Sequence, residues 1–305
     1  MKSIVLWALV LLCSSLCGQQ AVQLPNHLQN QNIYNPGAVG TSETDMNIGL
    51  VSRFQFINLN GAPRLYEGWG DVKLKSLLSA LGVNIKRETA GATELNDMSL
   101  TYAYKLFLSK KINLSMGLRL GYMFGKFNTT RLDHVFDPDD PLMGDANQIN
   151  SFKVGLGFKL YTDRYFVSLA SPDLYAPGYR YALSNDSAKA QESFFTHARN
   201  LILTSSYKLP IGDLYYLQPS LLLQVVPRYG MKMEPTLNFG LNNYFWFGAG
   251  YSNMSYLTFN AGAQISPKMK FAYIYELPFT SKVGNNVGFS SHSINLLIFM
   301  DGFSK

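Results

Sequence analysis

The sequence has little cysteine and little charge. Its two cysteines, Cys13 and Cys17, both lie within the first eighteen of 305 residues. If that stretch is removed, no thiol remains, which excludes disulfides and cysteine-based metal binding or nucleophilic catalysis. Charged residues make up 15% of the chain, against about 25% in an average soluble protein. Few charges together with 14% aromatic residues are typical of a wall that faces lipid.

An apolar run long enough for a helical membrane span is also lacking after the first residues. Such a span needs about twenty predominantly apolar residues. The stretch 235–267 carries no charge, but Asn, Gly, Ser and Thr interrupt it and its pattern repeats every two residues. Any crossing of a membrane would therefore use strands.

The N-terminus resembles an export signal. Met1, Lys2 and Ser3 precede an apolar run, residues 4–12, and a stretch of small residues, 13–18, which is the order of regions in a secretory signal peptide. We expect residues 1–18 to be removed. Lipidation of Cys17 is the alternative, although Leu16 is a poor residue before a lipid-modified cysteine.

Residues 112–125 show the pattern that recurs along the chain: large apolar side chains at nearly every even position, and Asn, Ser, Gly or Arg at most others. Since successive side chains of a strand point to opposite faces, one face is apolar and the other polar. Fourteen segments are strand candidates on this basis: 46–57, 65–76, 78–87, 97–108, 112–125, 151–161, 164–170, 199–208, 214–226, 235–242, 245–252, 257–265, 269–277 and 291–301. The pattern predicts an all-β fold, a transmembrane antiparallel β-barrel of outer-membrane type with about fourteen strands over residues 46–305.

The connections between these segments alternate in length. The even ones are tight: 77, 109–111, 162–163, 209–213, 243–244 and 266–268. Most odd ones are longer: 58–64, 88–96, 126–150, 171–198, 227–234 and 278–290, with 253–256 as the exception. Bacterial barrels have short periplasmic turns and longer extracellular loops. A soluble β-sandwich, the alternative for period-two strands, has no reason for this alternation.

Polar residues on the other face of the strands indicate an enclosed lumen. Segment 151–161 alternates apolar residues with Lys153, Gly155, Gly157 and Lys159, and lysines are tolerated there only if water or a polar interior receives them. By the same alternation Arg119 and Arg53 face the lumen. We expect Arg53 to pair with a carboxylate such as Asp71 or Glu67.

Several short motifs give the chain a family resemblance. They are Gln31–Gly40, Arg53-Phe54-Gln55, Asn60-Gly61-Ala62-Pro63, Tyr102-Ala103-Tyr104-Lys105, Phe136-Asp137-Pro138, Gln218–Leu222, Asn242–Gly250 and Ser291–Ile294. In order and spacing the chain resembles the PorP/SprF family of Bacteroidetes outer-membrane proteins, which are associated with type IX secretion and gliding motility. It departs from the family at Tyr275-Glu276-Leu277, at Ser290–Ser293 and at Glu88–Gly91.

The resemblance implies an integral outer-membrane accessory of type IX secretion that acts without catalysis. Such a protein aids the secretion or surface attachment of one cognate secreted protein through that protein's C-terminal region, and its partners are outer-membrane lipid, the cognate protein and other secretion components. A channel for small solutes or hydrophobic compounds is the alternative. No dense Lys/Arg cluster accompanies the net charge of +6, so we expect no nucleic-acid binding.

Family-motif residues are candidates for structural or partner-binding roles: Asn35, Pro36, Arg53, Gln55, Gly61, Ala62, Pro63 and His292. Asn35 and Pro36 predict a turn in residues 19–45, which we interpret as a periplasmic N-terminal segment or plug. Gly61, Ala62 and Pro63 predict a turn in the first loop. His292, at the start of the last strand, is interpreted as a hydrogen-bonding residue at the rim.

We expect no catalytic residues, no cofactor and no metal. Ser, His and Asp occur without the glycines or the placement of a nucleophile elbow. The loop 133–145 gathers five aspartates, and clustered oxygens are what Ca²⁺ requires. No recognised motif orders them, so a solvated acidic loop is the preferred interpretation.

The loops 126–150 and 171–198 are the longest. Loops of this length are usually functional or disordered, and aromatic residues on exposed loops favour a protein partner. The second loop provides the partner-binding candidates Tyr175, Tyr179, Tyr181, Phe194 and Phe195.

Overall fold

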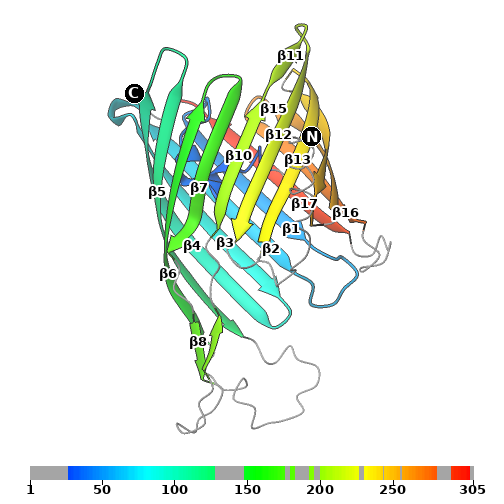
Figure 1. Ribbon diagram of the computed structural model, residues 1–305. Coiled ribbons are helices and arrows are strands. Elements are labelled where there is room, and N and C mark those ends of the chain that lie inside the picture. Colours follow the sequence, from blue (N-terminus) through cyan, green and yellow to red (C-terminus); the bar gives the residue numbers. More distant parts are fainter. Residues whose placement is uncertain are drawn as a thin grey trace, which may run out of the picture.

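Fourteen antiparallel wall strands close into a β-barrel (Figure 1). The computed structural model describes residues 27–127, 148–175, 179–182, 192–195, 200–226, 230–242, 244–254, 256–279 and 290–302. The first strand β1 pairs with the last strand β17 over its full length, and β10 pairs with β12. The ladder is thus continuous around the barrel, and every strand of the described wall has a partner on both sides.

The strands follow one another around the wall in sequence order. Their bounds are β1 (Met46–Phe54), β2 (Arg64–Leu74), β3 (Ser79–Ala90), β4 (Thr93–Phe107), β5 (Asn113–Phe127), β6 (Gln148–Tyr161), β7 (Tyr165–Tyr175), β10 (Leu201–Tyr207), β11 (Leu209–Ile211), β12 (Tyr215–Val226), β13 (Gly230–Leu241), β14 (Phe245–Ser252), β15 (Tyr256–Ser266), β16 (Met269–Pro278) and β17 (Ser291–Met300). Only Lys208 separates β10 from β11, and both pair with β12, so together they form one wall strand. A hairpin of β8 (Tyr179–Ala182) and β9 (Glu192–Phe195) makes a separate two-stranded sheet.

The two faces of the wall differ as the period of two predicts. On β4 the outward side chains Met98, Leu100 and Tyr102 are exposed, whereas Asp97, Ser99 and Thr101 are buried in the lumen. The outward apolar series of this strand runs from Met98 to Leu106. Eight residues tilted by about 40° span about 20 Å, close to the height of the apolar band on a transmembrane barrel.

Tight turns gather at one rim, which we call periplasmic, and the longer connections at the other, which we call extracellular. The strands extend farther toward the extracellular rim than the sequence predicts. The predicted loop 88–96 is wrong, because β3 and β4 continue to a turn at Gly91 and Ala92. Likewise β13 begins at Gly230 and β7 continues to Tyr175. Above the apolar band both faces meet water, so the period-two signal fades while the hydrogen-bonded ladder continues.

The helices of the described chain are short. They are α2 (Gln31–Tyr34), η1 (Pro36–Ala38) and η2 (Lys75–Leu77). None of the helices in the described ranges has the length and apolarity to cross a membrane.

We expect Leu100→Arg to destabilise the barrel by more than about 1 kcal/mol in a lipid bilayer, because Leu100 lies inside the outward apolar series, between Met98 and Tyr102, and is 68% exposed. The control is Leu108→Arg, the same change just beyond the end of β4, which should cost about 0–1 kcal/mol. Reversible unfolding by guanidinium in vesicles measures both. Equal costs would contradict a lipid-facing wall.

Candidate functional site: the luminal segment and its seat

Residues 27–45, here called the luminal segment, lie inside the barrel (dark blue in Figure 1). The segment ends at the periplasmic rim, where the side chain of Asp45 accepts a hydrogen bond from the backbone N–H of Gly302.

Short α2 and η1 follow each other directly, and Asn35 joins them. The Asn35 Oδ1 accepts a hydrogen bond from the N–H of Gly37 at 2.7 Å, and Pro36 occupies the first position of η1, which suits its fixed φ. The predicted turn at Asn35 and Pro36 is therefore present.

Two wall glycines make room for this turn. Gly117 on β5 and Gly157 on β6 pair directly across the ladder. A Cβ on Gly117 would overlap the carbonyl of Pro36, and a Cβ on Gly157 would overlap the side chain of Asn35. Asn35 also donates from Nδ2 to the carbonyl of Phe158 at 2.9 Å. The glycine pair therefore forms a notch in the wall that the turn fills.

Arg119 on β5 binds the C-terminal end of α2. Its guanidinium donates to the carbonyls of Asn32 and Ile33 and to the hydroxyl of Thr101, and the bond to Ile33 measures 3.0 Å. The last carbonyls of a helix have no partner within the helix. The Arg119 guanidinium supplies the donors that these two carbonyls lack.

Asp71 on β2 is the second anchor of the luminal segment. Its carboxylate accepts hydrogen bonds from Asn32 Nδ2 at 2.9 Å, from the N–H of Gly40 at 2.8 Å and from Asn47 Nδ2 at 2.6 Å. Three donors satisfy the buried charge, which would otherwise carry a large desolvation cost.

Lys159 on β6 is the third anchor. Its Nζ donates to Gln31 Oε1 at 2.6 Å and to Thr41 Oγ1 at 2.7 Å. Arg119, Asp71 and Lys159 thus hold both ends of the α2–η1 pair from three different wall strands.

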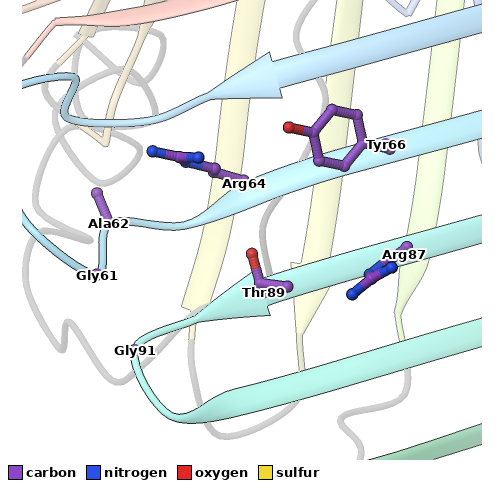
Figure 2. Close-up of a pocket in the computed structure, with 7 residues that line it drawn as sticks. All are labelled: Gly61, Ala62, Arg64, Tyr66, Arg87, Thr89 and Gly91. Atoms are coloured by element: carbon purple, nitrogen blue, oxygen red, sulfur yellow. The ribbon is translucent and has the colours of Figure 1, made fainter. Parts of the chain in front are cut away.

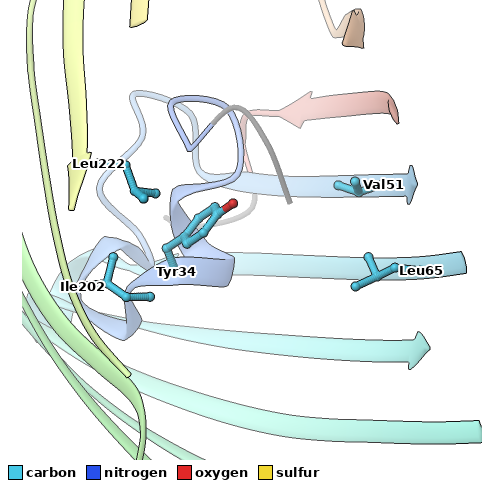
Figure 3. Close-up of a cluster of buried hydrophobic side chains, with 5 residues drawn as sticks. All are labelled: Tyr34, Val51, Leu65, Ile202 and Leu222. Atoms are coloured by element: carbon cyan, nitrogen blue, oxygen red, sulfur yellow. The ribbon is translucent and has the colours of Figure 1, made fainter. Parts of the chain in front are cut away.

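The side chain of Tyr34 crosses the lumen. It belongs to a buried cluster with Val51 and Leu65 of β1 and β2 and with Ile202 and Leu222 of β10 and β12 (Figure 3). In the order of the wall, β1 and β10 are seven strands apart in both directions. Apolar contacts therefore join opposite walls through one side chain of the luminal segment.

Buried ion pairs occupy other parts of the lumen. Arg53 Nη2 lies 2.5 Å from Glu276 Oε2, so the prediction that Arg53 faces the lumen is correct, but the predicted partners Asp71 and Glu67 are wrong. Arg53 reaches past β17 to β16, because the residues of β17 between them are the small, buried Ser291 and Ser293.

Three further ion pairs are similar. Lys153 pairs with Asp97 and with Asp173, the latter at 2.7 Å, and Lys232 pairs with Glu234 at 2.7 Å. Removing one member of such a pair leaves an uncompensated buried charge, which makes the luminal charges part of the structure of the wall.

The first-loop motif lies at the extracellular rim. The N–H of Gln55 donates to the carbonyl of Pro63 at 3.0 Å, and Ala62 closes a turn on Leu59. Gly61 has a φ of +72°, a conformation that glycine adopts without strain. Its carbonyl accepts from the N–H of Gly91 at 2.8 Å, so the first loop is tied to the turn between β3 and β4.

His292 lies near the extracellular end of β17 and bonds to its neighbours. One ring nitrogen bonds to the hydroxyl of Tyr273, and the other lies 3.2 Å from Ser290 Oγ. The imidazole also contacts the ring of Tyr275 edge-on.

The predicted partner-binding aromatics lie at and beyond the end of β7. Tyr175 is the last residue of β7 and is 54% exposed. Tyr179 and Tyr181 are in β8, and Phe194 and Phe195 are in β9, where the ladder pairs Tyr179 with Phe195. The side chains of these four residues lie outside the described part of the structure, as do the predicted acidic loop 133–145 and residues 1–26.

Sequence reasoning missed how the luminal segment is bound. It placed Arg119, Gly157 and Lys159 on the lumen face but assigned them no partner, and it did not single out Gly117. A signal was present: glycines at inward positions of adjacent strands indicate that another piece of backbone approaches closely.

The closed wall, the apolar outer belt and the polar, occupied lumen define a bacterial outer-membrane β-barrel. The chain belongs to the PorP/SprF family, described as type IX secretion system membrane proteins, whose model matches residues 16–297. No curated protein matches the chain in sequence.

Solved structures similar to the chain are outer-membrane barrels. One is the CymD monoaromatic hydrocarbon channel, with 13% identity, a TM-score of 0.52, and coverage of 92% of this chain and 95% of that one. Another is the toluene transporter TodX of Pseudomonas putida, with 9% identity, a TM-score of 0.50, and coverage of 91% and 93%. At these identities the likeness shows the fold alone.

We expect Gly157→Ala to release the luminal segment from its notch while the barrel still folds, because the added methyl group overlaps Asn35. The control is Gly70→Ala, where the nearest atoms to the added Cβ are at ordinary contact distances, 3.6 Å and beyond. Both glycine variants also carry Ala38→Cys, which provides a thiol for labelling at a position that is 2% exposed while the luminal segment is docked. Faster maleimide labelling is expected in the Gly157 variant only, and equal rates in the two would refute the role of the notch.

We expect docking of the luminal segment to weaken in acid through His27. Burial lowers the pKa of His27 to about 4, with Glu234 and Lys232 nearby acting in opposite directions, and neither ring nitrogen has a hydrogen-bond partner in the described ranges. A released His27 has a pKa of about 6.5, so docking is strongest above that pH and is lost progressively as pH falls toward 4. The shift corresponds to on the order of 3 kcal/mol.

The measurement is the labelling rate of the Ala38→Cys variant between pH 7 and pH 4, corrected for thiol ionisation with a free peptide thiol. His27→Gln, which cannot titrate, serves as the comparison. An acid response that is the same with histidine and with glutamine would contradict this assignment.

Proposed function

We propose that this barrel acts without catalysis as an outer-membrane accessory of type IX secretion, which helps one cognate secreted protein reach the cell surface or stay attached there by binding its C-terminal region. Membership of the PorP/SprF family supports the secretion role. The observation that best supports the accessory role is that the luminal segment lies inside the barrel, where its Tyr34 joins opposite walls.

An occupied lumen favours a plug. A folded or extended polypeptide passing through the lumen would have to displace the α2–η1 pair from Arg119, Asp71 and Lys159. Each hydrogen bond to a charged partner contributes about 1.5–3 kcal/mol, so displacement of all of them is costly. The secreted protein therefore meets this barrel at its surface and crosses the membrane elsewhere in the secretion system.

The long extracellular connections are the proposed contact surface for the cognate protein. The β8–β9 hairpin projects beyond the wall at the extracellular end (Figure 1). Its two strands contain four of the aromatic residues predicted to bind a partner: Tyr179, Tyr181, Phe194 and Phe195. Aromatic residues are enriched in protein interfaces.

The alternative is a channel for small solutes or hydrophobic compounds, which is what CymD and TodX are described to be. Conductance in a planar bilayer separates the two functions. With the luminal segment docked, we expect single-barrel conductance near the baseline of the bilayer. A stable open pore in the unmodified protein would favour the channel.

The surface role is tested by replacing residues 128–147 and 176–199 with short Gly-Ser connections. We expect loss of the cognate protein from the cell surface and from pull-downs of the detergent-solubilised barrel, because the proposed contact surface is gone. The control replaces the periplasmic turn 109–111 by Gly-Ser and should retain both. Surface attachment that persists without the two loops would refute the proposal.

A further inference from the structure

Three basic residues point outward at the extracellular ends of neighbouring strands. We call Arg64 of β2, Arg87 of β3 and Lys126 of β5, with the acidic Glu94 of β4, the rim patch. All three basic residues are exposed, and they alternate with the inward side chains Leu65 and Glu88, which are buried. Their side chains therefore leave the wall on the side that faces the membrane.

The strand register places these residues in two adjacent rows. Arg64 pairs with Thr89, Thr89 with Glu94, and Glu94 with Lys126. At about 4.8 Å per strand, the backbones of Arg64 and Lys126 are about 14 Å apart, a gap that two long side chains can bridge. Arg87 lies one outward position closer to the membrane, opposite Tyr66.

The charges of the rim patch are only partly compensated. Arg87 pairs with Glu94 at 2.7 Å, and no other ion pair of the patch occurs among the described residues. Three cations and one anion leave a net charge of +2. Exposed ion pairs are weak, so Arg87 remains free to exchange Glu94 for a stronger anionic partner.

A cavity of about 510 Å³ lies against the patch. Figure 2 shows Arg64, Tyr66, Arg87 and Thr89 on two neighbouring strands, with Gly61 and Gly91 in the connections at their ends. The hydrogen bond between these two glycines, N–H of Gly91 to carbonyl of Gly61, fixes the outer wall of the cavity. The cavity thus offers a preformed space beside two guanidinium groups.

The apolar band begins directly below the patch. The next outward row contains Ile85, Met98 and Tyr122, each about half exposed. A ligand at this level has its charged group beside the arginines and apolar chains along the wall beneath. This arrangement fits a lipid, because its headgroup can contact the arginines while its acyl chains lie along the apolar wall. A soluble anion or a peptide would use only the charges.

We propose that the rim patch binds the phosphate groups of a phosphorylated glycolipid in the outer leaflet of the outer membrane. Arg64 and Arg87 present forked guanidinium donors that match phosphate oxygens, and Lys126 adds a third positive charge. The bound lipid would orient the first-loop side of the barrel toward the leaflet surface. This inference is independent of the proposed secretion partner.

The test uses the full-length barrel in detergent, titrated with bisphosphorylated lipid A, with dephosphorylated lipid A and with inorganic phosphate. The test variant is R64Q/R87Q/K126Q. The control K110Q/K111Q/R164Q removes the same number of exposed cations from turns at the periplasmic rim. Circular dichroism checks that strand content is unchanged, and native mass spectrometry measures binding.

We expect bisphosphorylated lipid A to bind the unmodified barrel and the control alike, and to bind the test variant about tenfold more weakly or worse, since each cation near a lipid surface contributes severalfold in affinity. Equal affinity for dephosphorylated lipid A would refute phosphate recognition. Equal affinity for inorganic phosphate would refute the lipid and assign a soluble anion instead. Unchanged binding in the test variant would refute the site.

Discussion

The structure depends on one constraint: a strand that crosses hydrocarbon must have every backbone N–H and C=O bonded to another strand. The pairing of β1 with β17 meets it, because it closes the ladder and removes both edges. Closure then creates an interior that lipid cannot reach. Everything else in the molecule follows from having two different surroundings on the two sides of one strand.

The interior must be filled without a conventional core. Only small apolar clusters exist in the described lumen, and paired charges and serines occupy much of the rest. The luminal segment completes the filling. The luminal charges bind its helix carbonyls, which have no partner within the helix, and its amide groups. Arg119 and Asp71 are stable in the interior because the luminal segment supplies their partners, and the segment has a fixed position because they do.

The sequence predicted the wall well, since lipid outside and polar lumen inside impose a period of two on each strand. It located most of the short turns and the number of strands for the same reason, but residues 209–211 of the turn predicted at 209–213 belong to β11. It placed the ends of β3, β4 and β13 wrongly, because above the apolar band no difference between the two faces remains to be read. The sequence did not predict the partner of Arg53 either. Glu276 lies two strands away from Arg53, across Ser291 and Ser293 of β17. This contact depends on the small size of the side chains where β1 meets β17, and not on spacing along the chain.

The motif around Asn35 and Pro36 shows how a local signal acquires meaning from the fold. Alone it predicts a turn and nothing more. In the barrel, the same turn meets a glycine on each of two paired strands, and any side chain at either position would exclude it. Glycine weakens a strand slightly. The space that the turn at Asn35 and Pro36 requires explains why glycine occupies both positions. A barrel selected as an open pore would gain by filling these positions with larger residues, so the notch is a physical argument for a wall shaped around its own N-terminal segment.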